Sequence, residues 1–371
     1  MNRVVDHMRA SWCSSEQPAG KEHGGNIYQA SEETGIPISG IMDFSASINP
    51  LGVPESVVLA IQESIKYLPH YPEPYTEQLT TQLGRHLCIE PQTILCGNGS
   101  TELIYLVARA LAPRKALIPA PTFSEYERAC MMVRGTSCAR FDLARENNFD
   151  LDPEEFIAAM AGCDMAFLCN PNNPTGRSLK KDVVLAIADA AERQSCYLVV
   201  DEAFIDFAPE HSVVNDVARY SRLIVLRSLT KFYALSGLRI GYGVFPHGVA
   251  AVMKDHKEPW SVNSLAQKAG SVALNDQEYQ ARTMAVIREG KQFLEKGFAT
   301  LGVEYVPSDV NYYLLRLPNA REAIGSLREK GILIRDCSNF PGLDGSSVRV
   351  AVRSREENAA LLKELAGSCA Q

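Results

Sequence analysis

The sequence predicts an α/β fold with a mostly parallel sheet covered by helices on both faces, plus a smaller α+β domain. Apolar runs of strand length alternate with helical patterns over the first two thirds of the chain. This alternation is typical of crossover units, because parallel strands need a long return connection. The expected strands are 93–96, 115–118, 166–169, 197–200 and 223–226. The helical patterns cover 102–110, a stretch from 124 and 182–193.

The pattern changes beyond about residue 265. One long helical stretch over 264–300 precedes two alternating strand candidates and a last amphipathic helix. These later elements are expected at 311–316, 348–352 and 356–366. We therefore predict a mobile extension, a large domain and a small domain built from two segments. The mobile extension covers 1–20 and the large domain covers 51–264. The small domain combines 21–50 with 265–371.

The composition bounds the class of function. The net charge of −7 and the pI near 5.6 argue against a nucleic-acid partner. Ten cysteines are dispersed without a C-x-x-C pair, which favours free thiols in a reducing cytoplasm and predicts no metal site. No apolar run is long enough to span a membrane, and the first twenty residues lack the apolar core of a signal peptide. We expect a cytoplasmic protein.

Polar clusters directly follow four of the expected strands. They are 97–102, 170–176, 201–204 and 228–239. Ligands of parallel sheets bind at the carboxyl ends of the strands, so four such clusters predict a single site along one edge of the sheet.

The most informative cluster contains Lys231 at the end of an apolar strand. A buried lysine is costly unless its amine is used. A cofactor with an aldehyde and a phosphate would use the amine as a Schiff base, while Ser228, Thr230 and Arg239 hold the phosphate. The segment therefore indicates pyridoxal 5'-phosphate (PLP), with Lys231 as the catalytic residue.

The turn containing Gly99, Ser100 and Thr101 opens a helix after a strand. Such a helix N-terminus can bind the cofactor phosphate with its backbone N–H groups. The alternative, equally weighted, is an ordinary helix start capped by Ser100 or Thr101.

Four further residues have both a cofactor role and an ordinary one. Asp201 could pair with the pyridine nitrogen or cap a turn, and Asn173 could donate to the ring oxygen or simply form a turn. Phe123 could stack on the ring or belong to the core. Tyr71 could reach a phosphate or be a surface aromatic.

Five motifs in order resemble the fold-type I PLP enzymes, the aspartate aminotransferase superfamily. They occupy 98–101, 172–176, 201–203, 228–231 and 237–239. The resemblance implies the fold-type I transferase fold and PLP as cofactor.

Within that superfamily the chain is similar to two groups, the threonine-phosphate decarboxylases of cobalamin biosynthesis and the histidinol-phosphate aminotransferases. Five strings favour the decarboxylases, namely 23–28, 43–50, 201–207, 259–263 and 335–343. Ser47 departs from the asparagine more frequent in that family. Phe204 replaces a tyrosine usual in the aminotransferases and cannot donate a hydrogen bond.

The resemblance implies decarboxylation of L-threonine O-3-phosphate to (R)-1-amino-2-propanol phosphate. Arg335 and Arg349 are expected to grip the two anionic ends of this small phosphorylated amino acid, since an arginine fork binds carboxylate or phosphate at two points. Asn173 is expected to help bind the substrate, and His23 and Asn49 are expected to contact its phosphate.

The resemblance further implies a homodimer with shared active sites, in which Tyr71 comes from the neighbouring subunit. Two alternatives stay open. One is an aminotransferase acting on histidinol phosphate or another anionic amino acid, and the other is a PLP-fold binding protein without catalysis. The residues do not separate threonine phosphate from serine phosphate, because one methyl group contributes about 1 kcal/mol in a pocket.

Overall fold

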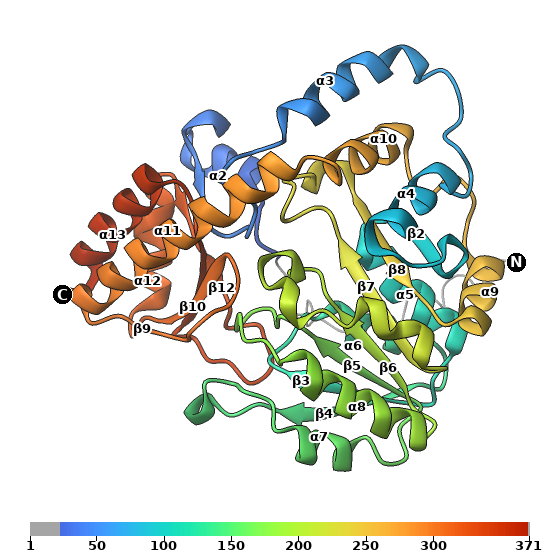
Figure 1. The fold of residues 1–371 in the computed structure, drawn as a ribbon. Coiled ribbons are helices and arrows are strands. Elements are labelled where there is room, and N and C mark those ends of the chain that lie inside the picture. The colour runs from blue at the N-terminus through green and yellow to red at the C-terminus, as the bar shows by residue number, and fades with distance from the viewer. Residues whose placement is uncertain (1–22, 370–371) are drawn as a thin grey trace, which may run out of the picture.

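The computed structural model describes residues 23–369 and contains a large sheet, a small sheet and the helices around them (Figure 1). The large sheet has the strand order β2-β8-β7-β6-β5-β3-β4. Among its seven strands only β8 runs antiparallel to its neighbours. The strands are β2 (Ile94–Asn98), β3 (Lys115–Ala120), β4 (Ser137–Asp142), β5 (Met165–Cys169), β6 (Tyr197–Asp201), β7 (Leu223–Ser228) and β8 (Ile240–Val244).

Both faces of this sheet are covered by helices, because its central strands are mostly apolar and are buried along almost their whole length. Val199 belongs to the core on one face and Val200 to the core on the other, as the pleat requires. One face carries α5 (Ser100–Leu111), α6 (Glu125–Met131) and α9 (His247–His256), and the other carries α7 (Pro153–Ala159) and α8 (Lys181–Arg193). The predicted fold class is confirmed, and each of the five expected strands forms. The sequence analysis missed β4 and β8.

Three helices cover the edge of the large sheet near β2 and β8. They are α3 (Glu55–Ser64), α4 (Glu77–Leu87) and α10 (Ser264–Ala273). Helix α10 packs against α3 and α4, so the predicted domain boundary at residue 265 falls inside a helix that packs on the large domain.

The single helix expected over 264–300 is instead two helices, α10 and α11 (Gln277–Leu301). Asp276 causes the break, because its Oδ1 accepts a hydrogen bond from the Tyr279 backbone N–H at 3.0 Å and caps α11. Its Oδ2 also accepts from the Ser56 hydroxyl at 2.7 Å, which ties the start of α11 to α3.

The small domain is built around a four-stranded antiparallel sheet in the order β12-β13-β10-β9. Strand β1 (Met42–Asp43) pairs in parallel with β11 (Ile332–Leu333), which places the segment before residue 50 beside the C-terminal third. The remaining strands are β9 (Glu304–Tyr305), β10 (Tyr312–Arg316), β12 (Arg335–Asp336) and β13 (Ser347–Ala351). The covering helices are α2 (Ile27–Thr34), α11, α12 (Ala320–Glu329) and α13 (Arg355–Cys369). The predicted extension 1–20 lies outside the described residues.

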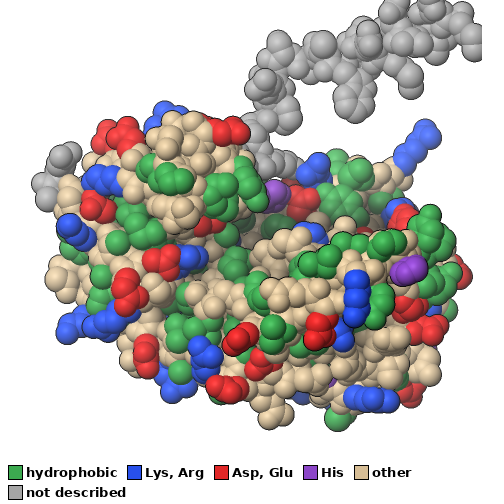
Figure 2. All heavy atoms as spheres, turned by 90° about the horizontal axis from the view of Figure 1, so that it is seen from above, with side chains coloured by type: hydrophobic (Ala, Val, Ile, Leu, Met, Phe, Trp, Pro, Cys, Tyr) green, Lys and Arg blue, Asp and Glu red, His purple; other side chains and the backbone are tan. Residues whose placement is uncertain are grey.

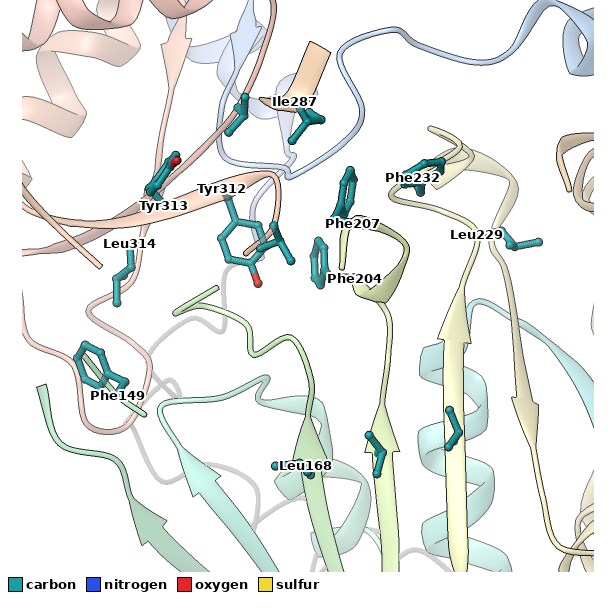
Figure 3. Close-up of a cluster of buried hydrophobic side chains, with 14 of the residues drawn as sticks. Phe149, Leu168, Phe204, Phe207, Leu229, Phe232, Ile287, Tyr312, Tyr313 and Leu314 are labelled. Carbon is teal, nitrogen blue, oxygen red and sulfur yellow. The ribbon is translucent and has the colours of Figure 1, made fainter. Parts of the chain in front are cut away.

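The two sheets meet through a continuous apolar core. Phe204, after β6, packs edge-on against Tyr312 of β10 with ring centroids 5.0 Å apart, and Figure 3 shows the two rings side by side. The Tyr312 hydroxyl donates to the Asn172 backbone carbonyl at 2.8 Å. These contacts fix the small sheet over the carboxyl ends of the large-sheet strands. Within residues 23–369, no helix has the length and apolar character needed to cross a membrane.

Candidate active site

A cavity of about 610 Å³ lies where the small sheet covers the carboxyl ends of the large-sheet strands. The polar clusters therefore converge at the edge of the sheet where the sequence predicts a single site. Ten of the predicted residues line the cavity: His23, Ser100, Thr101, Phe123, Asn173, Asp201, Lys231, Arg239, Arg335 and Arg349.

Lys231 follows the end of β7 and directs its amine into this cavity. Nζ donates to the Thr230 hydroxyl at 2.8 Å, and that hydroxyl lies 2.7 Å from the hydroxyl of Ser228. Burial, reinforced by Arg239, lowers the pKa of Lys231 to about 8, although Asp201 opposes the shift. A substantial fraction of the amine is therefore neutral near pH 8, and the neutral amine is the form that attacks a carbonyl.

The start of α5 forms an anion cradle. Gly99 is its N-cap residue, with φ 78°, and no side chain caps the helix. The alternative in which Ser100 or Thr101 caps the helix is therefore not what the structure shows. The first backbone N–H groups and the positive end of the helix dipole remain available for a phosphate.

Arg239 completes this cradle. A Cβ added to Gly99 would lie 2.5 Å from Nη2 of Arg239, so the guanidinium packs directly against the turn. A Cβ on Gly241 would lie 2.4 Å from the Ser100 backbone nitrogen. Glycine is needed at both positions for β8 and the start of α5 to approach so closely.

Asp201 ends β6 and is only 3% exposed. Its Oδ2 accepts from the Tyr126 hydroxyl at 2.7 Å, and its Oδ1 accepts from the Ala203 backbone N–H at 3.0 Å. Burial raises the pKa of Asp201, while the two hydrogen bonds and the charge of Lys231 counteract the shift. Asp201 forms no ion pair with any residue that the structure describes, so a cationic group of a bound ligand would be a suitable partner for its carboxylate.

Asn173 and Arg349 contact each other across the two sheets. Nη1 of Arg349 donates to Oδ1 of Asn173, and Nη2 donates to the Ser45 carbonyl at 2.9 Å. The amide nitrogen of Asn173 therefore remains free to donate to a ring oxygen. Nε of Arg349 is buried and makes no hydrogen bond within the part of the chain described here.

Arg335 and Arg349 are direct cross-strand partners on β12 and β13. Each is only 7% exposed, and like charges directly opposite each other destabilise a sheet. Nη2 of Arg335 donates to Oδ1 of Asn339 at 3.1 Å, which orients the side chain. An anionic ligand between the two guanidinium groups would offset their repulsion.

Five predicted residues do not line the cavity, namely Gly99, Asn49, Tyr71, Ser228 and Thr230. Asn49 donates to the Phe232 carbonyl and the Thr283 hydroxyl, both at 2.7 Å, so its amide holds the loop after β7 against α11. This position corrects the expectation that Asn49 contacts the substrate phosphate. Tyr71 is 86% exposed and packs on Trp260, outside the cavity of its own chain. Ser228 and Thr230 are buried behind Lys231 rather than lining the cavity.

Two of the cavity residues that were not predicted from the sequence are Glu125 and Tyr126, which follow shortly after Phe123. Both fall in a stretch that the sequence predicted only as helix. The available signal was their position, two and three residues after Phe123, which the sequence predicted to stack on the cofactor ring. The first turn of a helix that starts there stays at the same edge of the sheet.

Comparisons with known proteins agree with this geometry. The family described as aminotransferase class I and II matches residues 39–365. The chain belongs to this family. A threonine-phosphate decarboxylase from Salmonella typhimurium is 41% identical, over 92% of this chain and 95% of the relative.

Two solved structures are also similar. A histidinol-phosphate aminotransferase from Clostridium acetobutylicum has a TM-score of 0.82 and 32% identity, covering 88% of this chain and 98% of that one. An L-threonine-O-3-phosphate decarboxylase from Porphyromonas gingivalis has a TM-score of 0.77 and 29% identity. This match covers 88% of this chain and 99% of that one.

The cofactor is PLP, and the residues of the cavity fit it. The uncapped start of α5 and Arg239 suit the phosphate, the unpaired buried carboxylate of Asp201 suits the ring nitrogen, and Lys231 suits the aldehyde. Phe123 lines the same cavity, where an aromatic ring can stack on the pyridine.

The lowered pKa of Lys231 predicts a pH-dependent stability of the cofactor-free protein. The ordinary value is 10.5 and the folded value is about 8, so between these pH values the unfolded chain binds the proton that the folded chain has lost. Stability should therefore rise with pH across this window. Replacing Lys231 by methionine should stabilise the cofactor-free protein by about 2 to 3 kcal/mol below pH 8. The gain should vanish as the pH approaches 10.5.

Chemical denaturation at a series of pH values measures this difference. Lys296→Met on the exposed face of α11 is the matched control and should leave the pH dependence unchanged. A constant difference between Lys231→Met and wild type from pH 7 to 10.5 would contradict the prediction.

Proposed function

We propose that the protein decarboxylates L-threonine O-3-phosphate to (R)-1-amino-2-propanol phosphate, a step of cobalamin biosynthesis in the cytoplasm. The observation that carries the proposal is the 41% identity to the Salmonella typhimurium threonine-phosphate decarboxylase over nearly the whole of both chains. The cavity supports it, because it offers two buried arginines to a substrate with two anionic groups.

Bound PLP supplies an electron sink for the charge that develops at the substrate Cα. The residues of the chain would decide which bond of the substrate breaks, because they orient the substrate in the cavity. Arg349, held by Asn173 and the Ser45 carbonyl, can hold the substrate carboxylate in place for its loss. Lys231, whose pKa is about 8, can then return a proton to Cα.

The second candidate is transamination of histidinol phosphate. It is favoured by the TM-score of 0.82 to the Clostridium acetobutylicum histidinol-phosphate aminotransferase. That substrate has a phosphate but no carboxylate, so it would engage only one of the two arginines through an anion.

A direct assay separates the two candidates. The purified protein with PLP should release carbon dioxide from threonine phosphate without any amino acceptor, and Lys231→Ala should abolish the release. Rapid turnover of histidinol phosphate that depends on 2-oxoglutarate, with no carbon dioxide from threonine phosphate, would overturn the proposal. Serine phosphate in the same assay measures the selectivity for the methyl group.

Arg349→Gln should lower kcat/KM for threonine phosphate by about a hundredfold to a thousandfold, because a buried charge-assisted contact contributes about 3 to 4 kcal/mol. Steady-state kinetics measure the change. The matched control is Arg316→Gln, an arginine on neighbouring β10 whose side chain is 50% exposed and pairs with Glu304. Equal losses in the two variants would show that Arg349 acts only through the fold of the small sheet.

We further propose a homodimer with shared active sites. Figure 2 views the molecule from the side on which α3 lies and shows hydrophobic side chains on that face. Large apolar side chains are exposed along α3, along the following 3-10 helix (Ile65–Tyr67) and in the loop that carries Tyr71. They are Val58, Leu59, Ile65, Tyr67, Leu68, Tyr71, Tyr75 and Trp260. A second copy of the chain would cover this surface and bring Tyr71 to the cofactor phosphate of its partner.

Subunit mixing tests this arrangement. Tyr71→Phe and Lys231→Ala homodimers should each have reduced activity, but refolding them together should produce hybrids with one wild-type site. A sedimentation experiment should show a dimer for each variant. Monomeric wild-type protein, or no recovery of activity on mixing stable dimers, would contradict shared sites.

A further inference from the structure

Glu125 is a buried carboxylate in the cavity that the proposed reaction leaves without a role. It is the first residue of α6 and is only 4% exposed. A carboxylate removed from water requires hydrogen-bond donors or cations around it. The groups around Glu125 therefore indicate its role.

The two oxygens of Glu125 have different surroundings. Oε2 accepts a hydrogen bond from the Tyr105 hydroxyl of α5 and lies 3.7 Å from Nη1 of Arg128. Oε1 is buried and has no hydrogen-bond partner among the described residues. Nε2 of His23 lies 3.3 Å from Oε1, across the cavity wall. The unsatisfied oxygen therefore faces the histidine.

His23 comes from a segment that fits closely against the small domain. The Gly25 backbone N–H donates to the Ser45 hydroxyl at 2.7 Å. A Cβ on Gly24 would lie 2.2 Å from the Ser45 carbonyl oxygen, so only glycine allows this approach. The His23 ring lies 6.0 Å from the ring of Phe123 and is about half exposed. Among the described residues, Glu125 and this packing hold His23 at the cavity.

We propose that Glu125 is a positioning residue that holds the imidazole of His23 beside the substrate phosphate. With Nε2 directed at the carboxylate, the other ring nitrogen is left to serve the phosphate. An imidazole that donates from both nitrogens carries a positive charge, so it can stand between two anions that would otherwise repel each other. The inference rests on the proposed function, since it assumes a phosphorylated substrate.

Charged groups on each side of the cavity are consistent with this arrangement. Arg128 on α6 lies beyond Glu125, Asp43 on β1 lies below the segment of His23, and Arg335 lines the opposite wall. Oδ1 of Asp43 is already bonded to the backbone and hydroxyl of Ser45, which leaves Glu125 as the carboxylate that faces the imidazole.

A double-mutant cycle in the PLP-bound enzyme tests the proposal. Glu125→Gln keeps an acceptor for Tyr105 but removes the charge, and His23→Gln removes the imidazole. Each should raise KM for threonine phosphate about tenfold, with kcat changed by less than about threefold, because one charge-assisted hydrogen bond is lost. The double variant should show no further rise, because Glu125 acts through His23. Multiplicative losses of about a hundredfold would overturn the proposal.

Tyr105→Phe is the control for a purely structural role. It removes the hydroxyl bonded to Oε2 and leaves the contact between Oε1 and His23 intact. KM should change by less than about twofold. If Tyr105→Phe raises KM as much as Glu125→Gln does, Glu125 acts through the packing of α5 on α6 and the inference is wrong.

Binding of inorganic phosphate to the PLP-bound enzyme, followed by calorimetry, gives a readout without turnover. Glu125→Gln and His23→Gln should each weaken phosphate binding about tenfold relative to wild type. If threonine phosphate is not decarboxylated and the phosphate affinity still falls in both variants, the proposed function fails and the role of Glu125 stands. If decarboxylation occurs and Glu125→Gln binds phosphate as tightly as wild type, the inference fails alone.

Discussion

The structure depends on opposite charges that are buried together at the carboxyl ends of neighbouring strands. Lys231 follows β7 and Asp201 ends β6, and these strands are adjacent and parallel. Burial pushes each group toward its neutral form, lowering the pKa of the lysine and raising the pKa of the aspartate. A cofactor that bonds to the amine and places a protonated nitrogen against the carboxylate would satisfy both groups, which are costly for the fold by itself.

The small sheet adds two buried arginines above this pair. Arg335 and Arg349 face each other across β12 and β13, and the side chain of Arg349 reaches down to Asn173 of the large domain. The contact between Phe204 and Tyr312 holds these layers together. The cavity thus has a cofactor level fixed by the large sheet and a substrate level fixed by the small sheet, and reaction type depends on how the second level orients a ligand over the first.

Site residues that directly follow a strand were predictable from the sequence. Lys231, Asp201 and the turn at Gly99 each stand directly after an apolar strand, and parallel strands must bring such positions to one edge. Asn49 shows where this reasoning fails. It lies in a string that suggested a substrate contact, yet its amide is used by Phe232 and Thr283, which are far away in sequence. Glu125 was missed for the converse reason, because its position just after Phe123 places it at the edge of the sheet but does not show whether its side chain faces solvent or the cavity.

The sequence by itself determined the fold class and the cofactor, because strand periodicity and strand-end chemistry are local properties. Only the tertiary structure decided that the start of α5 is uncapped, that Arg335 and Arg349 are direct neighbours, and that His23 meets Glu125. Whether a helix end is capped depends on side-chain geometry. The contact between His23 and Glu125 joins segments far apart in the chain. Both pairings are set by sheet register and packing, which sequence spacing does not encode.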